Sequence, residues 1–219
     1  MTGKTIEVSY DDKTLLICNQ RCREWTHPYA YEGDGEDLHA AGCGIFSLSH
    51  AVEWMTGRRV SIESLADFSV QNGGRGDDGT DRPALLAAVK ERGLAARLGF
   101  DYHMDGHLND REALWAHVSG GRGVALSNIR AGHIVLLCAA RVQEGERQLL
   151  VVDSFCESAD ARVREQVRGT IRGSEITFEV QNRAGLSVGT ATQYAMYWVP
   201  LAMAVDFNLL HYVKDEDGR

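Results

Sequence analysis

The sequence predicts an α+β fold, in which helices come first and an antiparallel sheet follows. Between residues 43 and 118, apolar residues recur at spacings of three and four, which is typical of helices with one buried face. After the glycine-rich stretch 120–123, short apolar runs separated by turn residues are typical of strands. This segregation favours α+β over an alternating α/β arrangement. No repeat or linker interrupts the chain, so we expect one domain over residues 1–219, with a helical part at about 43–118 and a sheet part at about 123–205.

The expected helices have recognisable ends. The first begins at or just after Cys43 and ends near Thr56, because Gly57 is a common residue just past a helix. Side chains that can accept a hydrogen bond from first-turn N–H groups mark the start of the others. The candidate N-caps are Ser61 for the second helix, Thr80 or Asp81 for the third, and Asn109 or Asp110 for the fourth.

The expected strands are short runs rich in Val, Ile, Leu and aromatic residues. They cover residues 5–10, 14–18, 124–129, 134–142, 148–152, 176–180 and 194–199. The segment 98–109 is ambiguous, with a short strand suggested around Tyr102, and the charged segment 157–172 is either a helix or a surface loop. The long segment 19–41 has no periodicity, but its aromatic residues predict a loop packed against the domain.

Composition excludes several classes of protein. The formal net charge is −8 over 219 residues, which argues against a nucleic-acid partner because phosphate binding needs a basic surface. No apolar run has the length of a membrane span or the form of a signal peptide, so we expect a cytoplasmic protein with no membrane partner. The five cysteines are an odd number in a chain of this size, which favours free thiols in a reducing compartment.

Cys43 stands out because it lies between Gly42 and Gly44 at the start of an apolar helical pattern. Free N–H groups and the positive end of the helix dipole favour a thiolate there. The glycines allow unusual backbone angles and the close approach of another chain. Cys43 is therefore a candidate nucleophile. The alternative is a small buried side chain in a tight turn.

His133 and Asp153 are the candidates for a base and for the acid that orients it. His133 stands at the head of an apolar strand, and Asp153 closes the next one. The hairpin between these strands is expected to bring the two residues to the same end of the pair, where the carboxylate can accept a hydrogen bond from the imidazole. The alternatives are a structural histidine and an acid that only ends a strand.

Gln20 is the candidate donor to an oxyanion. A side-chain amide upstream of the nucleophile can act with the backbone N–H of Cys43 to bind a tetrahedral intermediate. Asn19, its neighbour, is the competing candidate.

Together these residues resemble a papain-like cysteine peptidase, with similarity to stand-alone relatives of the bacteriocin-processing peptidases that cut after a double glycine. The resemblance covers roughly residues 15–156. It rests on four stretches: Asn19-Gln20 with Trp25 and Pro28-Tyr29, Ala41-Gly42-Cys43-Gly44, Thr56-Gly57-Arg58-Arg59-Val60-Ser61, and Gly132-His133-Ile134-Val135-Leu136 with Val151-Val152-Asp153.

The resemblance implies a papain-like fold and a thiol protease, a hydrolase with a Cys-His-Asp catalytic triad. It makes Cys43 the nucleophile, His133 the base, Asp153 the orienting acid and Gln20 the oxyanion donor. The expected partner is a peptide or amide substrate, with no cofactor and no metal. We carry over the reaction class and not the double-glycine substrate. The residues expected to contact the substrate are Trp25, Tyr29, Gly42 and Gly132.

Three alternatives remain open at the level of sequence. The same triad can serve an amidase or a transamidating acyltransferase, because fold and triad do not determine the substrate. The chain can be a binding or regulatory module with a silent site. Cys18 and Cys22, four residues apart, can form half of a zinc site with a histidine.

Overall fold

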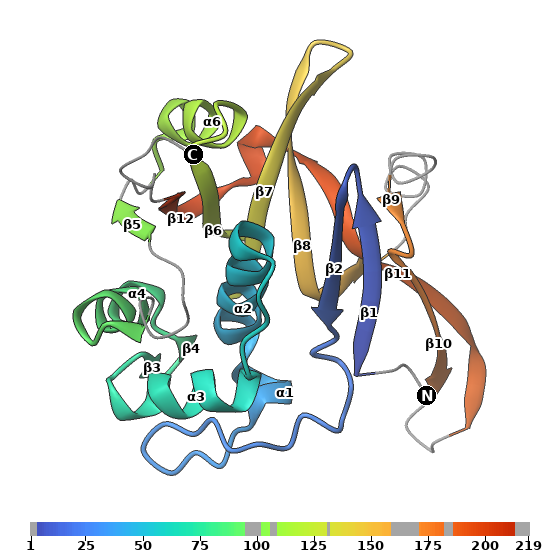
Figure 1. Cartoon of the computed structure of the whole chain (residues 1–219). Helices are drawn as coiled ribbons and strands as arrows, with labels where there is room; N and C mark the ends of the chain where they lie inside the picture. Colours follow the sequence, from blue (N-terminus) through green and yellow to red (C-terminus); the bar gives the residue numbers. More distant parts are fainter. Residues whose placement is uncertain are drawn as a thin grey trace.

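The computed structural model describes residues 4–94, 102–105, 109–130, 132–158, 171–181 and 186–212. Its main sheet has seven strands in the order β10-β11-β8-β7-β6-β12-β5 (Figure 1). The strands are β5 (Tyr102–Asp105), β6 (Gly123–Arg130), β7 (His133–Gln143), β8 (Glu146–Ser158), β10 (Glu175–Gln181), β11 (Ser187–Pro200) and β12 (Val205–Tyr212). All neighbouring pairs are antiparallel. Helices pack against this sheet, which confirms the α+β prediction.

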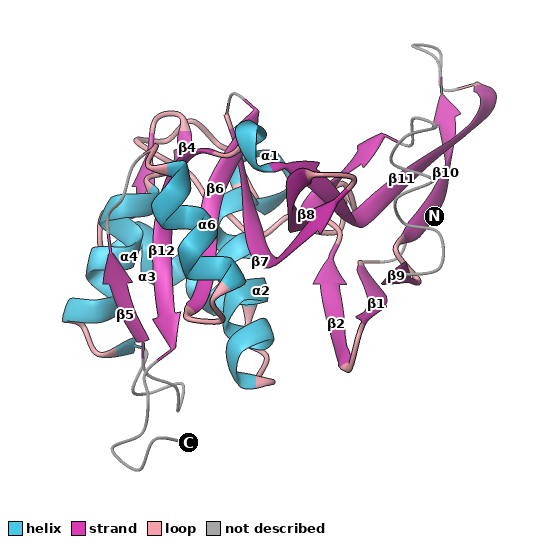
Figure 2. Ribbon diagram, turned by 90° about the horizontal axis from the view of Figure 1, so that it is seen from above, coloured by secondary structure: helices cyan, strands magenta, loops and turns pink. Residues whose placement is uncertain are grey.

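The N-terminal strands lie outside the main sheet. β1 (Thr5–Tyr10) and β2 (Lys13–Cys18) lie where strands were predicted and pair with each other, and β9 (Ile171–Arg172) joins β1 to complete a three-stranded sheet. Figure 2 shows this sheet and β10 at one end of the molecule, with α2, α3, α4 and α6 at the other. A two-residue hairpin is formed by β3 (Arg75–Gly76) and β4 (Gly79–Thr80).

Four of the described helices begin at predicted signals, whereas the short helix at Leu38–Ala41 lies in the segment that was expected to be a loop. The helices are α1 (Leu38–Ala41), α2 (Cys43–Thr56), α3 (Ile62–Gln71), α4 (Arg82–Glu91) and α6 (Arg111–Ser119), with a short 3-10 helix at Leu201–Met203. The side chains of Ser61, Asp81 and Asp110 each accept a first-turn N–H, so Asp81 and Asp110 are the caps of the third and fourth predicted helices. Gly57 ends α2 with a φ of 69°, in the left-handed region that favours glycine.

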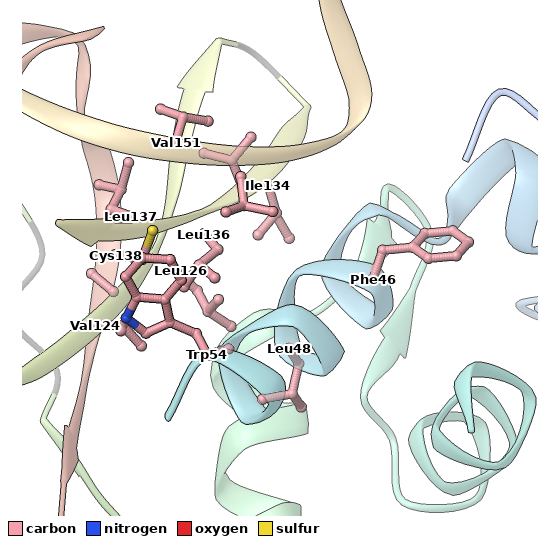
Figure 3. Packing of buried hydrophobic residues seen from close by; sticks show 14 of the residues in the cluster. Phe46, Leu48, Trp54, Val124, Leu126, Ile134, Leu136, Leu137, Cys138 and Val151 are labelled. Atoms are coloured by element: carbon pink, nitrogen blue, oxygen red, sulfur yellow. The ribbon is translucent and has the colours of Figure 1, made fainter. Parts of the chain in front are cut away.

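Helix α2 is buried against the sheet along most of its length. Ile45 and Phe46 are completely buried, and Leu48 is nearly so. Figure 3 shows residues of this helix beside apolar side chains of the strands. Burial of each such side chain contributes about 1.5–3 kcal/mol to folding. This packing positions the residue at the start of α2 against β7 and β8.

Several elements differ from the prediction. β12 was not predicted, although its central residues Phe207–Leu210 are buried. It lies between β6 and β5, where both faces are covered, so its sequence lacks the alternation of a half-exposed strand. Of the charged segment 157–172, residues 159–170 lie outside the described part of the chain, and the residues on either side are in strands. Among the described helices, none is long and apolar enough to cross a membrane.

Candidate active site

Cys43 is the first residue of α2, directly after Gly42. Its side chain is partly exposed, and the N–H groups of the first helical turn lie beside it. Close packing explains why glycine stands on both sides of Cys43, because neither position has room for a Cβ. A Cβ at position 44 would lie 2.5 Å from Cβ of Thr80, and one at position 42 would lie 2.5 Å from the carbonyl oxygen of Leu38. The unusual backbone angle that we expected is absent at Gly42, whose φ is −82°.

His133 begins β7 and is buried. Gly132 before it has a φ of 68°, with open space where a side chain would stand, so the glycine serves the turn between β6 and β7. The Nε2 atom of His133 lies 2.7 Å from Oδ1 of Asp153, so this nitrogen carries a proton and donates. The hairpin of β7 and β8 thus brings together the two residues predicted as base and orienting acid.

Asp153 is completely buried. Besides the ring of His133, Oδ1 accepts the backbone N–H of Phe155 at 2.8 Å, and Oδ2 accepts the hydroxyl of Tyr197 at 2.7 Å. The prediction that Asp153 closes its strand is wrong, because β8 continues to Ser158. The carboxylate is therefore held from two strands and by its own backbone.

Opposing effects act on the pKa of His133. Burial lowers it, whereas hydrogen bonds to Asp153 and to the side chain of Cys43, together with the negative charges of both partners, raise it. The effects of Asp153 and Cys43 outweigh the effect of burial, and the pKa is raised from 6.5 to about 9. His133 is consequently an imidazolium at neutral pH. With Nε2 bound to Asp153, Nδ1 is the nitrogen left for Cys43.

Ser47 links α2 to the strand that carries His133. It lies four residues after Cys43 and therefore on the same face of the helix. Its buried hydroxyl donates to the carbonyl oxygen of Ile134, the residue after His133, at 2.9 Å. This bond sets the position of the helix start relative to the imidazole.

Gln20 follows β2 and is held between β8 and α1. Its backbone N–H donates to the carbonyl of Ser154 at 2.8 Å, and its Oε1 accepts the hydroxyl of Ser154 at 3.1 Å. Its Nε2 donates to the carbonyl of His39 at 3.2 Å, and Nδ1 of His39 donates back to the carbonyl of Gln20 at 2.8 Å. Gln20 therefore adjoins the short helix that leads into Cys43. The side-chain oxygen of Asn19 accepts the N–H of Arg21 within the same loop.

Trp25 and Tyr29 lie in the core. Trp25 is 4% exposed, packs edge-to-face on Phe46 and donates its indole N–H to the carbonyl of Asn19. Tyr29 is 0% exposed, and its hydroxyl is hydrogen-bonded to the hydroxyls of Ser69 and Thr80. Almost none of either ring is exposed, although both residues were expected to contact the substrate. The two rings anchor the loop to the core, because burial of a large aromatic ring contributes strongly to stability.

Arg75 ties this loop to the β3–β4 hairpin beside Cys43. Its guanidinium is 1% exposed and donates to the carbonyls of Tyr29 and Gly79 and to the carboxylates of Asp34 and Glu36. A planar group with five N–H donors suits this arrangement, whereas an ammonium cannot reach all four acceptors.

We expect Arg75→Lys to lower the free energy of unfolding by about 2 kcal/mol, because carbonyls and carboxylates lose their donors. Urea unfolding followed by circular dichroism measures the loss. Arg23→Lys, at an exposed position, is the matched control and should leave the midpoint unchanged. Equal midpoints for Arg75→Lys and the unmodified protein would contradict an anchoring role.

The alternative of a metal site at Cys18 and Cys22 can be checked over the part of the chain that the structure describes. Among the described residues, no three His, Cys, Asp or Glu side chains are grouped as metal ligands. Nε2 of His50 accepts the backbone N–H of Cys18 at 2.9 Å. Burial raises the pKa of the Cys18 thiol to about 12, which disfavours the thiolate that a metal requires.

The structure also assigns contacts that were not predicted. Tyr197, Ser154, Ser47 and His39 each bind a predicted site residue or its neighbour. The spacing of Ser47 four residues after Cys43 was a usable signal, because both side chains fall on one helix face. Tyr197 lies beyond residue 156, outside the region that carries the family resemblance, and sits in an apolar strand that has no local signal of a polar role.

Comparisons with known proteins include a distant similarity to a solved structure. No family model matches the chain, and no curated protein matches its sequence. Among solved structures, UfSP from C. elegans is similar with a TM-score of 0.47 and 11% sequence identity, over 97% of this chain and 35% of that chain. The chain thus spans about a third of that protein's length. Likeness at this level carries no argument about function, which must come from the site itself.

Proposed function

We propose that this chain is a papain-like cysteine hydrolase that cleaves a peptide or amide bond through a thioester. The observation that carries the proposal is the hydrogen bond of 2.7 Å between His133 and the fully buried Asp153, on a ring whose other partner is Cys43 at a helix start. These are the nucleophile, base and orienting group that acyl transfer requires.

The first half of the reaction forms the acyl-enzyme. The Cys43 thiolate attacks the substrate carbonyl, and the oxyanion is bound by the N–H of Cys43 and the side-chain amide of Gln20. The side-chain amide of Gln20 donates one of its two hydrogens to the carbonyl of His39, which leaves the second hydrogen for the oxyanion. As the intermediate collapses, the C–N bond breaks, the His133 imidazolium gives its proton to the departing amine, and a thioester remains.

The second half releases the acid. His133, now neutral, accepts a proton from a water molecule as that water attacks the thioester carbonyl. The C–S bond then breaks, the carboxylic acid leaves, and the thiolate–imidazolium pair is restored. An amine in place of water gives transamidation on the same residues, so the nature of the acceptor separates hydrolase from transferase.

Alkylation distinguishes an active site from a silent one. We expect iodoacetamide at pH 6 to modify Cys43 at least ~10-fold faster than the other described thiols, because its sulfur is partly exposed and lies beside the charged ring of His133. Burial raises the pKa of Cys18 to about 12 and raises that of Cys138 well above its usual range, so both should react slowly. Mass spectrometry of peptides from the labelled protein measures each site.

The control for this labelling is His133→Ala, which removes the imidazolium and leaves the helix start intact. It should slow modification of Cys43 at pH 6 and leave the slow thiols unchanged. Uniformly slow labelling of all thiols in the unmodified protein would favour a silent binding module instead.

A further inference from the structure

Tyr197, His133 and Asp153 lie on one face of the main sheet, although they come from three strands. Leu137 of β7 pairs with Val151 of β8, and Val151 pairs with Tyr197 of β11. Side chains at intervals of two residues point to the same face of a strand. His133 lies four residues before Leu137, and Asp153 lies two residues after Val151. The pairing therefore directs all three polar side chains to one side.

The reach of Tyr197 follows from this register. Asp153 is the diagonal neighbour of Tyr197, two residues beyond its direct partner, and a long side chain can span that distance. The hydroxyl of Tyr197 donates to Oδ2 of Asp153 at 2.7 Å, while Oδ1 holds the His133 ring at 2.7 Å. Tyr197 is 2% exposed and Asp153 is 0% exposed, so water does not compete for this bond.

We propose that Tyr197 is a positioning residue of the site, which acts through Asp153 to hold the imidazole of His133. A buried carboxylate needs hydrogen-bond donors on both oxygens. Without them, the carboxylate can rotate about its bond to Cβ. The N–H of Phe155 and the ring of His133 bind one oxygen, and Tyr197 binds the other. The role rests on the proposed function, and it extends the site into the C-terminal third of the chain.

A double-mutant cycle tests the role. We expect Tyr197→Phe to lower kcat about 10-fold for peptide hydrolysis with KM unchanged, because the base is less well oriented while substrate contacts remain. In an Asp153→Asn background the same replacement should change kcat less than about 2-fold, because its effect passes through Asp153. Tyr212→Phe, at the end of β12, loses a side-chain hydrogen bond with Trp54 of α2; it is the control and should keep full activity.

A second measurement does not depend on turnover. The proton on Nε2 of His133 is followed by NMR as a downfield imidazole resonance, and we expect Tyr197→Phe to speed its exchange with water several-fold. Tyr212→Phe should not change this exchange. Placing 3-fluorotyrosine at position 197 keeps the hydroxyl and should restore slow exchange, which shows that the lost oxygen, and not altered packing, is responsible.

The outcomes separate this role from the proposed function. Unchanged kcat and unchanged exchange in Tyr197→Phe would overturn the positioning role. Equal losses of kcat in the Asp153 and Asp153→Asn backgrounds would also overturn it, because Tyr197 would then act independently of the carboxylate. Faster exchange in a protein that hydrolyses no peptide would support the role of Tyr197 and reject the peptidase.

Discussion

Replacement of Cys43 by alanine is expected to reduce hydrolysis of any substrate by at least ~1,000-fold, because no other group at the start of α2 can form the thioester. The protein should stay folded, since the side chain is partly exposed and alanine suits the first turn of a helix. Steady-state kinetics measure the loss, and thermal unfolding followed by circular dichroism measures the fold.

Cys18→Ala is the matched control for this experiment. Cys18 is a partly exposed thiol outside the proposed site, at the end of β2, and its loss should leave turnover within about 2-fold of the unmodified protein. Full activity in Cys43→Ala, or equal losses in the two variants, would reject Cys43 as the nucleophile.

Replacement of Asp153 by asparagine is expected to lower turnover at pH 7 by about 100- to 10,000-fold. The buried carboxylate is what raises the pKa of His133 to about 9 against the effect of burial, together with Cys43. With a neutral amide in its place, burial dominates, the pKa falls, and the ring loses its charge at neutral pH. NMR titration of the His133 ring follows the pKa directly.

The sign of the accompanying change in stability follows from the raised pKa. The pKa of His133 is about 9 in the folded protein and 6.5 in the unfolded chain, so the charged ring stabilises the fold fully below pH 6.5, and this stabilisation is lost as the pH rises through 9. We expect the unmodified protein to lose this contribution between pH 6.5 and 9, and Asp153→Asn to lack most of it throughout. Urea unfolding at a series of pH values measures both curves.

A histidine–aspartate pair on the surface of the protein provides the control for Asp153→Asn. Nε2 of His27 lies 2.8 Å from Oδ1 of Asp67, which is the same pairing in an exposed setting. Asp67→Asn should leave turnover unchanged, because the effect of Asp153 depends on burial beside Cys43. A loss in Asp67→Asn equal to that in Asp153→Asn would indicate a general electrostatic effect and contradict the orienting role.

Local sequence predicted most of the elements that carry the site. The start of α2 at Cys43, its end before Gly57 and the three side-chain caps depend on neighbouring residues, so the chain reveals them without tertiary information. The β7–β8 hairpin is also local, and its turn at Glu144 and Gly145 has the positive φ values of a tight hairpin. This hairpin is why His133 and Asp153 could be paired in advance.

The aromatic residues of the loop show where local reasoning fails. The aromatic residues correctly predicted a loop packed against the domain, but substrate contact was also expected for Trp25 and Tyr29, and both rings are buried. The partners that bury them, Phe46, Ser69 and Thr80, come from α2, α3 and β4. Nothing in the loop itself indicates which of its faces meets those elements. The local sequence around an aromatic residue is the same whether its ring packs in the core or lines a cleft.

The sequence by itself determined the nucleophile candidate, the helix that begins there, and the hairpin that joins base to acid, because caps, periodicity and turns act over a few residues. Only the tertiary structure decided what holds the acid. Tyr197 meets Asp153 across 44 residues of chain, through the pairing of β11 with β8. Strand order and register depend on the burial of whole faces, which no local pattern encodes.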